Sequence, residues 1–193
     1  GKRFADAGLA LCPANSYMWA EGLLAAEIAL ETPGVDSVDL VYLADSQTSV
    51  ASTKSFLRMC TKPQYHIKDK VLVQWPYATG YTVTMPGEHE LFNALPWGGG
   101  GEPTWYLGDE RVRNCRVLVS FRNQIMFRAV MDLLERFEKE CRDVPADEQE
   151  RITNQWGGEV TTVEPPREDP EVNRCVLSCY GRGKTASVNV VLR

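Results

Sequence analysis

The chain has 193 residues, of which 44% are hydrophobic and 24% charged, and its formal net charge is −5. This composition is that of a globular protein with room for one large or two small domains, and it excludes a wholly disordered chain. No apolar run approaches the roughly 20 residues that cross a bilayer, and no secretory signal is recognisable at the start, so we expect no membrane partner. The negative charge excludes a protein that coats nucleic acid by bulk electrostatics, although a local basic groove stays compatible with it.

The cysteines are scattered along the chain without a CxxC pair. They are Cys12, Cys60, Cys115, Cys141, Cys175 and Cys179. Because His66 and His89 are the only histidines, we do not expect a structural zinc site. Buried free thiols without disulfides are typical of a reducing compartment, so the sequence predicts an intracellular protein.

The first part of the chain alternates helical and extended patterns. The predicted elements are a helix over 19–31, a strand over 38–44, a helix over 47–59 and a strand over 70–75. The first helix is rich in Ala, Leu and Glu and is closed by Pro33-Gly34, and Asp45-Ser46 offers an N-cap for the second. The order strand, helix, strand predicts parallel pairing through a right-handed crossover.

Four consecutive glycines, Gly98 to Gly101, lie between Pro96 and Pro103. Such a run continues neither a helix nor a strand, so we predict a linker over 96–105. The predicted lobes are therefore 1–95 and 106–193.

The second lobe is predicted to be α+β with an antiparallel sheet. Its predicted elements are a strand over 115–121, an amphipathic helix over 125–137 and strands over 158–163, 172–180 and 185–192. The last two strands are joined by Gly181-Arg182-Gly183-Lys184, which is typical of a hairpin loop.

Two carboxylates are candidates for metal binding. Glu21 lies in the first turn of the first predicted helix, and Asp45 follows the apolar strand over 38–44. Because sites in open α/β sheets form beyond the carboxyl ends of strands, both could hold Mg²⁺ there. The structural alternatives are that Glu21 complements the helix dipole and that Asp45 caps the next helix.

The segments 15–30 and 41–47 resemble the ribonuclease H family, including the ribonuclease H domains of retroelements. In that family a helix bearing an acidic ligand precedes a strand ending in Asp-Ser, as Glu21 precedes Asp45-Ser46 here. Segments 71–76 and 86–95 look like the family's last strand and closing helix, so the resemblance covers about residues 5–95. It implies an α/β fold with a ribonuclease H-like mixed sheet, Mg²⁺ as cofactor and hydrolysis of the RNA strand of RNA–DNA hybrids. Glu21, Asp45 and Asp6 would be the catalytic residues, and Glu21 and Asp45 the metal ligands.

The chain departs from the family pattern at two places. Asp6 stands too close to Glu21 for the family's opening hairpin, so that the hairpin is lost or its strands are absent from this chain. Asn93 occupies the place of the fourth acidic residue, for which Glu88 or Glu90 could substitute. These departures leave open an active nuclease and a degenerate domain without catalysis.

Positive charge gathers before the helix over 125–137. The residues are Arg111, Arg113, Arg116 and Arg122, with Trp105 and Tyr106 nearby. Arginines beside aromatics can contact phosphates and stack on bases, whereas a mixed-charge surface is the structural alternative.

Three functional hypotheses result. The first is a nucleic-acid-associated protein that binds RNA or an RNA–DNA hybrid through a ribonuclease H-like domain. The second is a non-catalytic structural or protein-interaction subunit of a ribonucleoprotein or viral assembly. The third is an interaction domain whose resemblance is accidental, because a fold by itself does not determine function.

Overall fold

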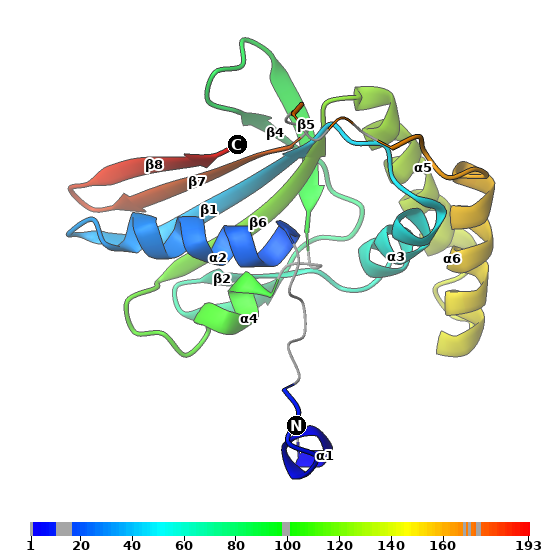
Figure 1. Ribbon diagram of the computed structural model, residues 1–193, viewed down its shortest axis with the longest axis horizontal. Helices are drawn as coiled ribbons and strands as arrows, with labels where there is room; N and C mark the ends of the chain where they lie inside the picture. The colour runs from blue at the N-terminus through cyan, green and yellow to red at the C-terminus, as the bar shows by residue number, and fades with distance from the viewer. Residues whose placement is uncertain (1, 11–16, 98–100, 168, 170, 173–174) are drawn as a thin grey trace.

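One mixed β-sheet organises the protein. The computed structural model describes residues 2–10, 17–97, 101–167, 169, 171–172 and 175–193. The strands are β1 (Val35–Ala44), β2 (Tyr65–Lys68), β3 (Val71–Gln74), β4 (Tyr81–Thr84), β5 (Leu91–Pro96), β6 (Asn114–Phe121), β7 (Cys175–Gly183) and β8 (Ser187–Leu192). Their order is β3-β2-β6-β1-β7-β8, and β5 also pairs with β6 and carries β4 on its other side. The protein therefore has an α/β fold built on an open mixed sheet (Figure 1).

The described helices are α1 (Lys2–Asp6), α2 (Tyr17–Leu30), α3 (Val50–Cys60), α4 (Glu102–Tyr106), α5 (Gln124–Glu140) and α6 (Ala146–Val160). Helix α2 runs along β1, β7 and β8, and α4 lies against β6. Helices α3, α5 and α6 stand together at the end of the sheet (Figure 1). None of the helices in the described part of the chain is long and apolar enough to cross a membrane.

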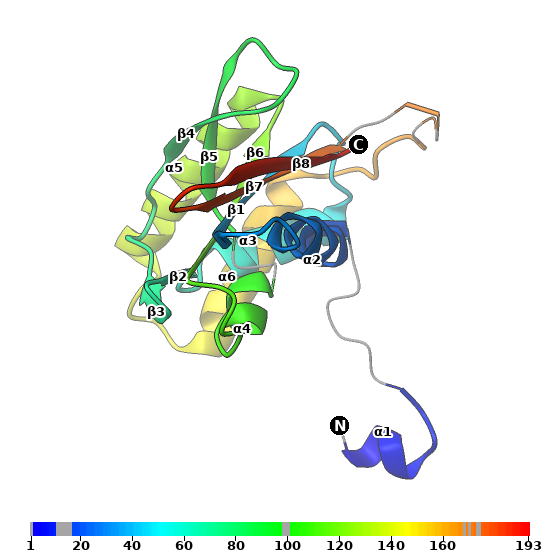
Figure 2. The same cartoon turned by 90° about the vertical axis from the view of Figure 1, so that its left-hand side faces the viewer.

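Strand β1 lies in the middle of the sheet, parallel to β6 and antiparallel to β7. Val38, Leu40 and Tyr42 are fully buried and belong to the main core, together with residues of α2 and α5. Side chains of a strand alternate between two faces, so Asp39 and Val41 point to the opposite side. Figure 2 shows α2 and α4 on one side of β7 and β8, with the β4–β5 hairpin rising on the other.

The sheet does not divide into the two predicted lobes. Strand β1, from the predicted first lobe, lies between β6 and β7, which both belong to the predicted second lobe. Strand β5, which ends at Pro96, pairs with β6 across the predicted linker over 96–105. Of that segment, residues 98–100 lie outside the described part, and α4 begins at Glu102. The glycine run thus connects two parts of one sheet.

Three predicted elements differ from the structure. The segment over 86–95, which resembled a closing helix, contains β5, because pairing with β4 and β6 buries Phe92 and Ala94. The first half of the predicted strand over 158–163 belongs to α6, which ends at Val160. Gly157 allows this helix to approach α3 closely, since a β-carbon there would lie 2.8 Å from Cα of Lys54.

The predicted parallel strand over 70–75 is β3, which pairs only with β2 at one end of the sheet order. Asp69 and Lys70 both have positive φ, 50° and 66°, as a two-residue hairpin turn requires. This turn returns the chain beside β2 and makes an antiparallel hairpin in place of the expected crossover to β1. The N-cap of α3 is Ser49, which accepts from the Ser52 backbone N–H at 3.1 Å, and not Asp45 or Ser46.

Five of the six cysteines lie in the described residues, none of these five is in a disulfide, and Cys175 alone among them is not buried. Burial raises the pKa of the Cys179 thiol to about 12. Cys12 lies outside the described residues. A buried thiol with a raised pKa stays protonated and acts as a small apolar side chain.

A buried hydrogen bond joins the sheet to α4 beneath α2. The Tyr42 hydroxyl donates to Oε1 of Glu102 at 2.6 Å, and both residues are 0% exposed. Gly22 of α2 lies directly over this bond, where a β-carbon would overlap both Tyr42 Oη and Glu102 Oε1. Burial raises the pKa of the Glu102 carboxyl to about 7, although the bond from Tyr42 opposes the shift.

We predict that Gly22→Ala destabilises the fold by roughly 1–3 kcal/mol, because the added methyl group overpacks the Tyr42–Glu102 contact. Alanine ordinarily stabilises a helix by about 1 kcal/mol relative to glycine, so the sign of the effect is diagnostic. Urea unfolding measures it. The control is Gly108→Ala, where nothing lies within 4 Å of the added carbon. Equal or greater stability of the Gly22 variant would contradict this packing.

We also predict that Glu102 makes stability depend on pH. Its pKa of about 7 in the folded protein exceeds the ordinary 4.5, so its contribution is complete below pH 4.5 and is lost as pH rises through 7. The loss is about 3 kcal/mol, and Glu102→Gln removes this pH dependence. Unfolding free energies at about pH 4 and about pH 8 test the effect, with the exposed Glu110→Gln as control. Parallel profiles for Glu102→Gln and the native chain would refute it.

Candidate functional site

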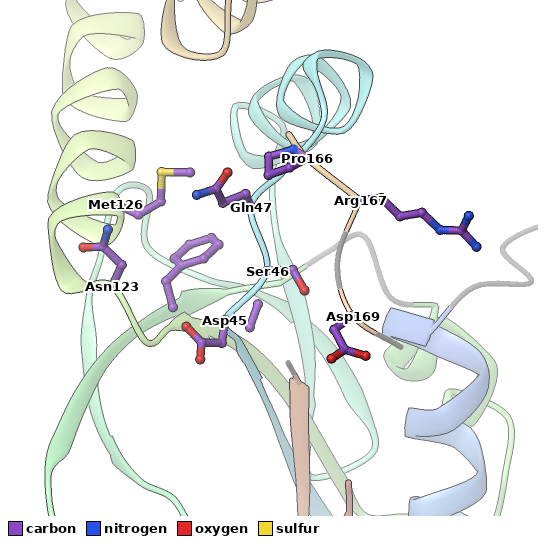
Figure 3. A pocket seen from close by; sticks show the side chains of 10 residues that line it. Asp45, Ser46, Gln47, Asn123, Met126, Pro166, Arg167 and Asp169 are labelled. Carbon is purple, nitrogen blue, oxygen red and sulfur yellow. The ribbon is translucent and has the colours of Figure 1, made fainter. Parts of the chain in front are cut away.

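A pocket of about 480 Å³ opens at the carboxyl end of β1 (Figure 3). Asp45, Ser46 and Gln47 line it after β1, and Asn123 and Met126 line it from the start of α5. Arg167 also belongs to the lining, but Figure 3 shows its side chain pointing away from the other labelled residues. The pocket lies where the carboxyl ends of the parallel strands β1 and β6 meet, the expected place for a site in an α/β sheet.

Two polar side chains of this pocket, Asp45 and Asn123, are engaged in structural contacts. Asp45 forms an ion pair with Arg122 at 3.3 Å, and Arg122 also binds Glu88 at 2.7 Å. The Asn123 side chain accepts from the Ile125 backbone N–H at 3.0 Å and caps α5. These contacts stabilise the start of α5 and the loop that follows β1 without a bound ligand.

The other predicted catalytic residues lie elsewhere on the surface. Glu21 is exposed on α2. Helix α2 begins near the carboxyl end of β1, since the ring centroids of Tyr17, at the start of α2, and Tyr42, near the end of β1, are 5.5 Å apart. Asp6 is exposed in α1, which buries none of its residues and lies apart from the sheet in both views (Figures 1 and 2). Within the described ranges, no three His, Cys, Asp or Glu side chains are grouped so that they could hold a metal ion.

The four arginines predicted to bind nucleic acid are all paired with carboxylates. Arg111 binds Glu27 and Asp109, Arg113 binds Asp69, Arg116 binds Asp39, and Arg122 binds Asp45 and Glu88. Arg113 and Arg122 flank the two ends of β6, so the four do not form one patch. Of them, Arg116 alone lines a large cavity on the sheet.

That cavity is a groove of about 700 Å³ on the face of the sheet opposite α2. Asp39 and Val41 of β1, Arg116 and Leu118 of β6, and Tyr180 of β7 form its floor, while β4 and the following loop provide a wall. All the residues that line it belong to strands and loops, and none to a helix. We call this face the open face and the cavity the open-face groove.

Strand register builds a polar row across the open face. Asp39 is paired with Arg116 on one side and Tyr180 on the other, and Tyr180 is paired with Asn189. On β2, Ile67 pairs with Cys115, so His66 lies beside Arg116. The row therefore runs from His66 through Arg116, Asp39 and Tyr180 to Asn189.

Asp39 is the centre of the row. Arg116 donates to it from Nε at 2.6 Å and from Nη2 at 2.5 Å, and Arg182 donates from Nε at 3.0 Å. Burial alone would raise the pKa of Asp39, but the hydrogen bonds from both arginines outweigh it and lower the pKa below its usual value. The carboxylate stays ionised and holds the guanidinium groups of Arg116 and Arg182 against itself.

Two buried polar atoms near the groove have no hydrogen-bond partner among the described residues, Nε1 of Trp75 and Nδ1 of His66. Trp75 is 8% exposed and lines the groove, and the centroids of the Trp75 and His66 rings are 4.1 Å apart. Buried polar groups in proteins are nearly always satisfied, so each such atom calls for an explanation.

Sequence reasoning identified Arg116 but missed Asp39, Arg182 and Tyr180. The predicted strand over 38–44 is mostly apolar, but Asp39 interrupts the apolar run and is the signal for a polar face. Arg182 was placed in a hairpin loop, whereas β7 extends to Gly183. No pattern in the sequence indicated which strands would place these residues side by side.

A model of the family of unknown function DUF5938 matches residues 20–193. A search of curated proteins found no match. Among solved structures, the chain is similar to apo histidine-tagged saccharopine dehydrogenase (L-Glu forming) from Saccharomyces cerevisiae, with 10% identity and a TM-score of 0.46. The match covers 89% of this chain and 56% of the yeast chain, and at this level it describes neither an activity nor a ligand. The family match spans most of the chain, which therefore belongs to the DUF5938 family.

Proposed function

We propose that this chain is a ligand-binding domain and that the open-face groove binds a small organic molecule. The observation that carries the proposal is a groove of about 700 Å³ on a sheet face whose lining includes no helix residue. Sites for small molecules commonly measure about 300–1,000 Å³ and combine an apolar lining with a few placed polar groups. The groove has this size and this composition.

The groove offers both apolar contact and hydrogen bonds. Val41 and Leu118 provide an apolar floor, and Tyr81 and Tyr180 provide aromatic surface. Tyr180 is 44% exposed, so its ring is available to a ligand. Aromatic side chains bury large area and favour planar partners, which supports a ligand with an apolar, ring-shaped body.

The proposal differs from the functions expected from the sequence, which were nucleic-acid association and protein interaction. Hydrolysis of RNA in hybrids would require a group of metal ligands, and no contact among the described residues specifically favours that activity. The paired arginines likewise offer no shared surface for a nucleic acid backbone. Small-molecule binding uses the contacts that the open face provides.

Titration with naphthalene-2-carboxamide, a neutral planar probe, tests the proposal. We expect saturable shifts of the Trp75 indole N–H resonance in nuclear magnetic resonance spectra, assigned with Trp75→Phe. Tyr180→Ala should weaken binding by about 3- to 10-fold, because it removes one aromatic contact.

The matched control is Leu24→Ala, which truncates an exposed apolar side chain on α2, away from the groove. It should leave the affinity unchanged. Absence of saturable shifts with naphthalene-2-carboxamide and with its two anionic analogues, naphthalene-2-carboxylate and 2-naphthyl phosphate, or equal weakening by both variants, would rule out the groove as the binding site.

A further inference from the structure

We infer that the ligand carries an anionic oxygen group, a carboxylate or a phosphate, seated in a pocket at the side of the open-face groove. This inference rests on the proposed function and specifies the chemistry of its ligand. The pocket measures about 290 Å³ and shares Trp75 and Arg116 with the groove. We call it the side pocket.

Register brings the cationic residues of the side pocket together. His66 and Lys68 alternate with the buried Ile67 on β2 and therefore face the same side as Arg116. Arg182 of β7 is paired with Ser37 of β1, two residues before Asp39, and therefore lies on the same face of the sheet as Asp39. Lys68, Arg116 and Arg182 all line the side pocket, and no carboxylate is among the described residues that do so.

The local charge is positive although the chain is acidic overall. Three cationic side chains, Lys68, Arg116 and Arg182, line the side pocket, and Asp39 is paired with the two arginines. The Asp39 side chain is 18% exposed, whereas the side chains of Arg116 and Arg182 are 45% and 37% exposed. The positive charge is thus presented outward and remains partly uncompensated.

Donor capacity also remains after the internal contacts are made. The described bonds engage Nε and Nη2 of Arg116 and Nε of Arg182. A guanidinium group has five N–H donors, so the remaining Nη hydrogens of both residues can bind an oxyanion. Because Asp39 fixes both groups beforehand, little side-chain entropy is lost on binding.

Two of the residues that line the side pocket, Trp75 and His66, have a ring nitrogen without a partner in the described part of the chain. An indole N–H can only donate, so the atom that satisfies Nε1 of Trp75 must be an acceptor, such as a carboxylate or phosphate oxygen. Burial and the positive charges of Arg116 and Lys68 lower the pKa of His66, so its imidazole is neutral near pH 7 and adds a hydrogen bond without further charge. Both rings line the side pocket.

The test compares three probes with one body: naphthalene-2-carboxylate, 2-naphthyl phosphate and the neutral naphthalene-2-carboxamide. We expect at least one anion to bind about tenfold or more tightly than the carboxamide, since charge-assisted hydrogen bonds are the stronger ones. The preferred anion identifies the head group as carboxylate or phosphate. Raising the salt concentration from about 0.05 M to about 0.5 M should weaken only the anions.

Arg182→Gln and, separately, Lys68→Gln should each reduce the preference for the anion over the carboxamide, because each removes one cationic donor of the side pocket. Lys68 is exposed, so its variant should remain folded. Arg151→Gln, on α6 and paired with Glu148, is the matched control and should preserve the preference.

The outcomes separate the two proposals. Equal affinity for the carboxamide and both anions overturns the anionic head group but supports the groove as a binding site. An anion preference that survives in both the Arg182 and Lys68 variants overturns the side pocket. Failure of all three probes to bind refutes the proposed function itself.

Discussion

Strand β1 is the constraint on which the rest of the structure depends. It is paired along both edges, with β6 and with β7, so its side chains are assigned alternately to two faces and cannot rotate between them. Tyr42 is directed under α2 and Asp39 into the open face. A shift of one residue in register would exchange these positions and would bury the Asp39 carboxylate in the core.

On the face covered by α2, a polar contact is buried in the core, and the hydrogen bond between its two side chains satisfies both hydrogen-bonding atoms. The bond between Tyr42 and Glu102 ties α4 to the centre of the sheet, and Gly22 lets α2 close over it. Oε2 of Glu102 has no partner among the described residues, so an ionised carboxyl would be poorly compensated there. The short helix α4 is therefore held to the sheet best when Glu102 is protonated.

On the open face, the same alternation of side chains presents a carboxyl group whose pKa is lowered and not raised. Asp39 is ionised and satisfied by Arg116 and Arg182, and these arginines remain partly exposed. A carboxylate that organises two guanidinium groups gives a rigid array of donors on strands, which move less than loops. The overall charge of −5 conceals this local excess of positive charge. Net charge alone therefore says little about what a single face of the protein attracts.

Local pattern in the sequence determined several elements closely. The apolar run before Asp45, the amphipathic stripe over 125–137 and the alanine-rich segment over 19–31 correspond to β1, α5 and α2. The last hairpin is also confirmed as β7 and β8. In each case the signal lies within one element, and burial of that element's own apolar side chains is sufficient to form it.

Other elements depend on contacts with distant parts of the chain. Segment 91–96 is a strand because β4 and β6 supply its partners, and α6 continues to Val160 and approaches Lys54 of α3 closely at Gly157.

The sequence by itself determined the α/β class, the central apolar strand and Arg116 as a residue of interest. The tertiary structure alone decided that the residues around that arginine are Asp39, Arg182, His66 and Tyr180. It also decided the surroundings of Glu21, Asp45 and Asp6, since no group of three or more possible metal ligands occurs among the described residues. The physical reason is strand register. Pairing partners and their alignment are set by hydrogen bonds between segments far apart in the chain, and no local pattern encodes them.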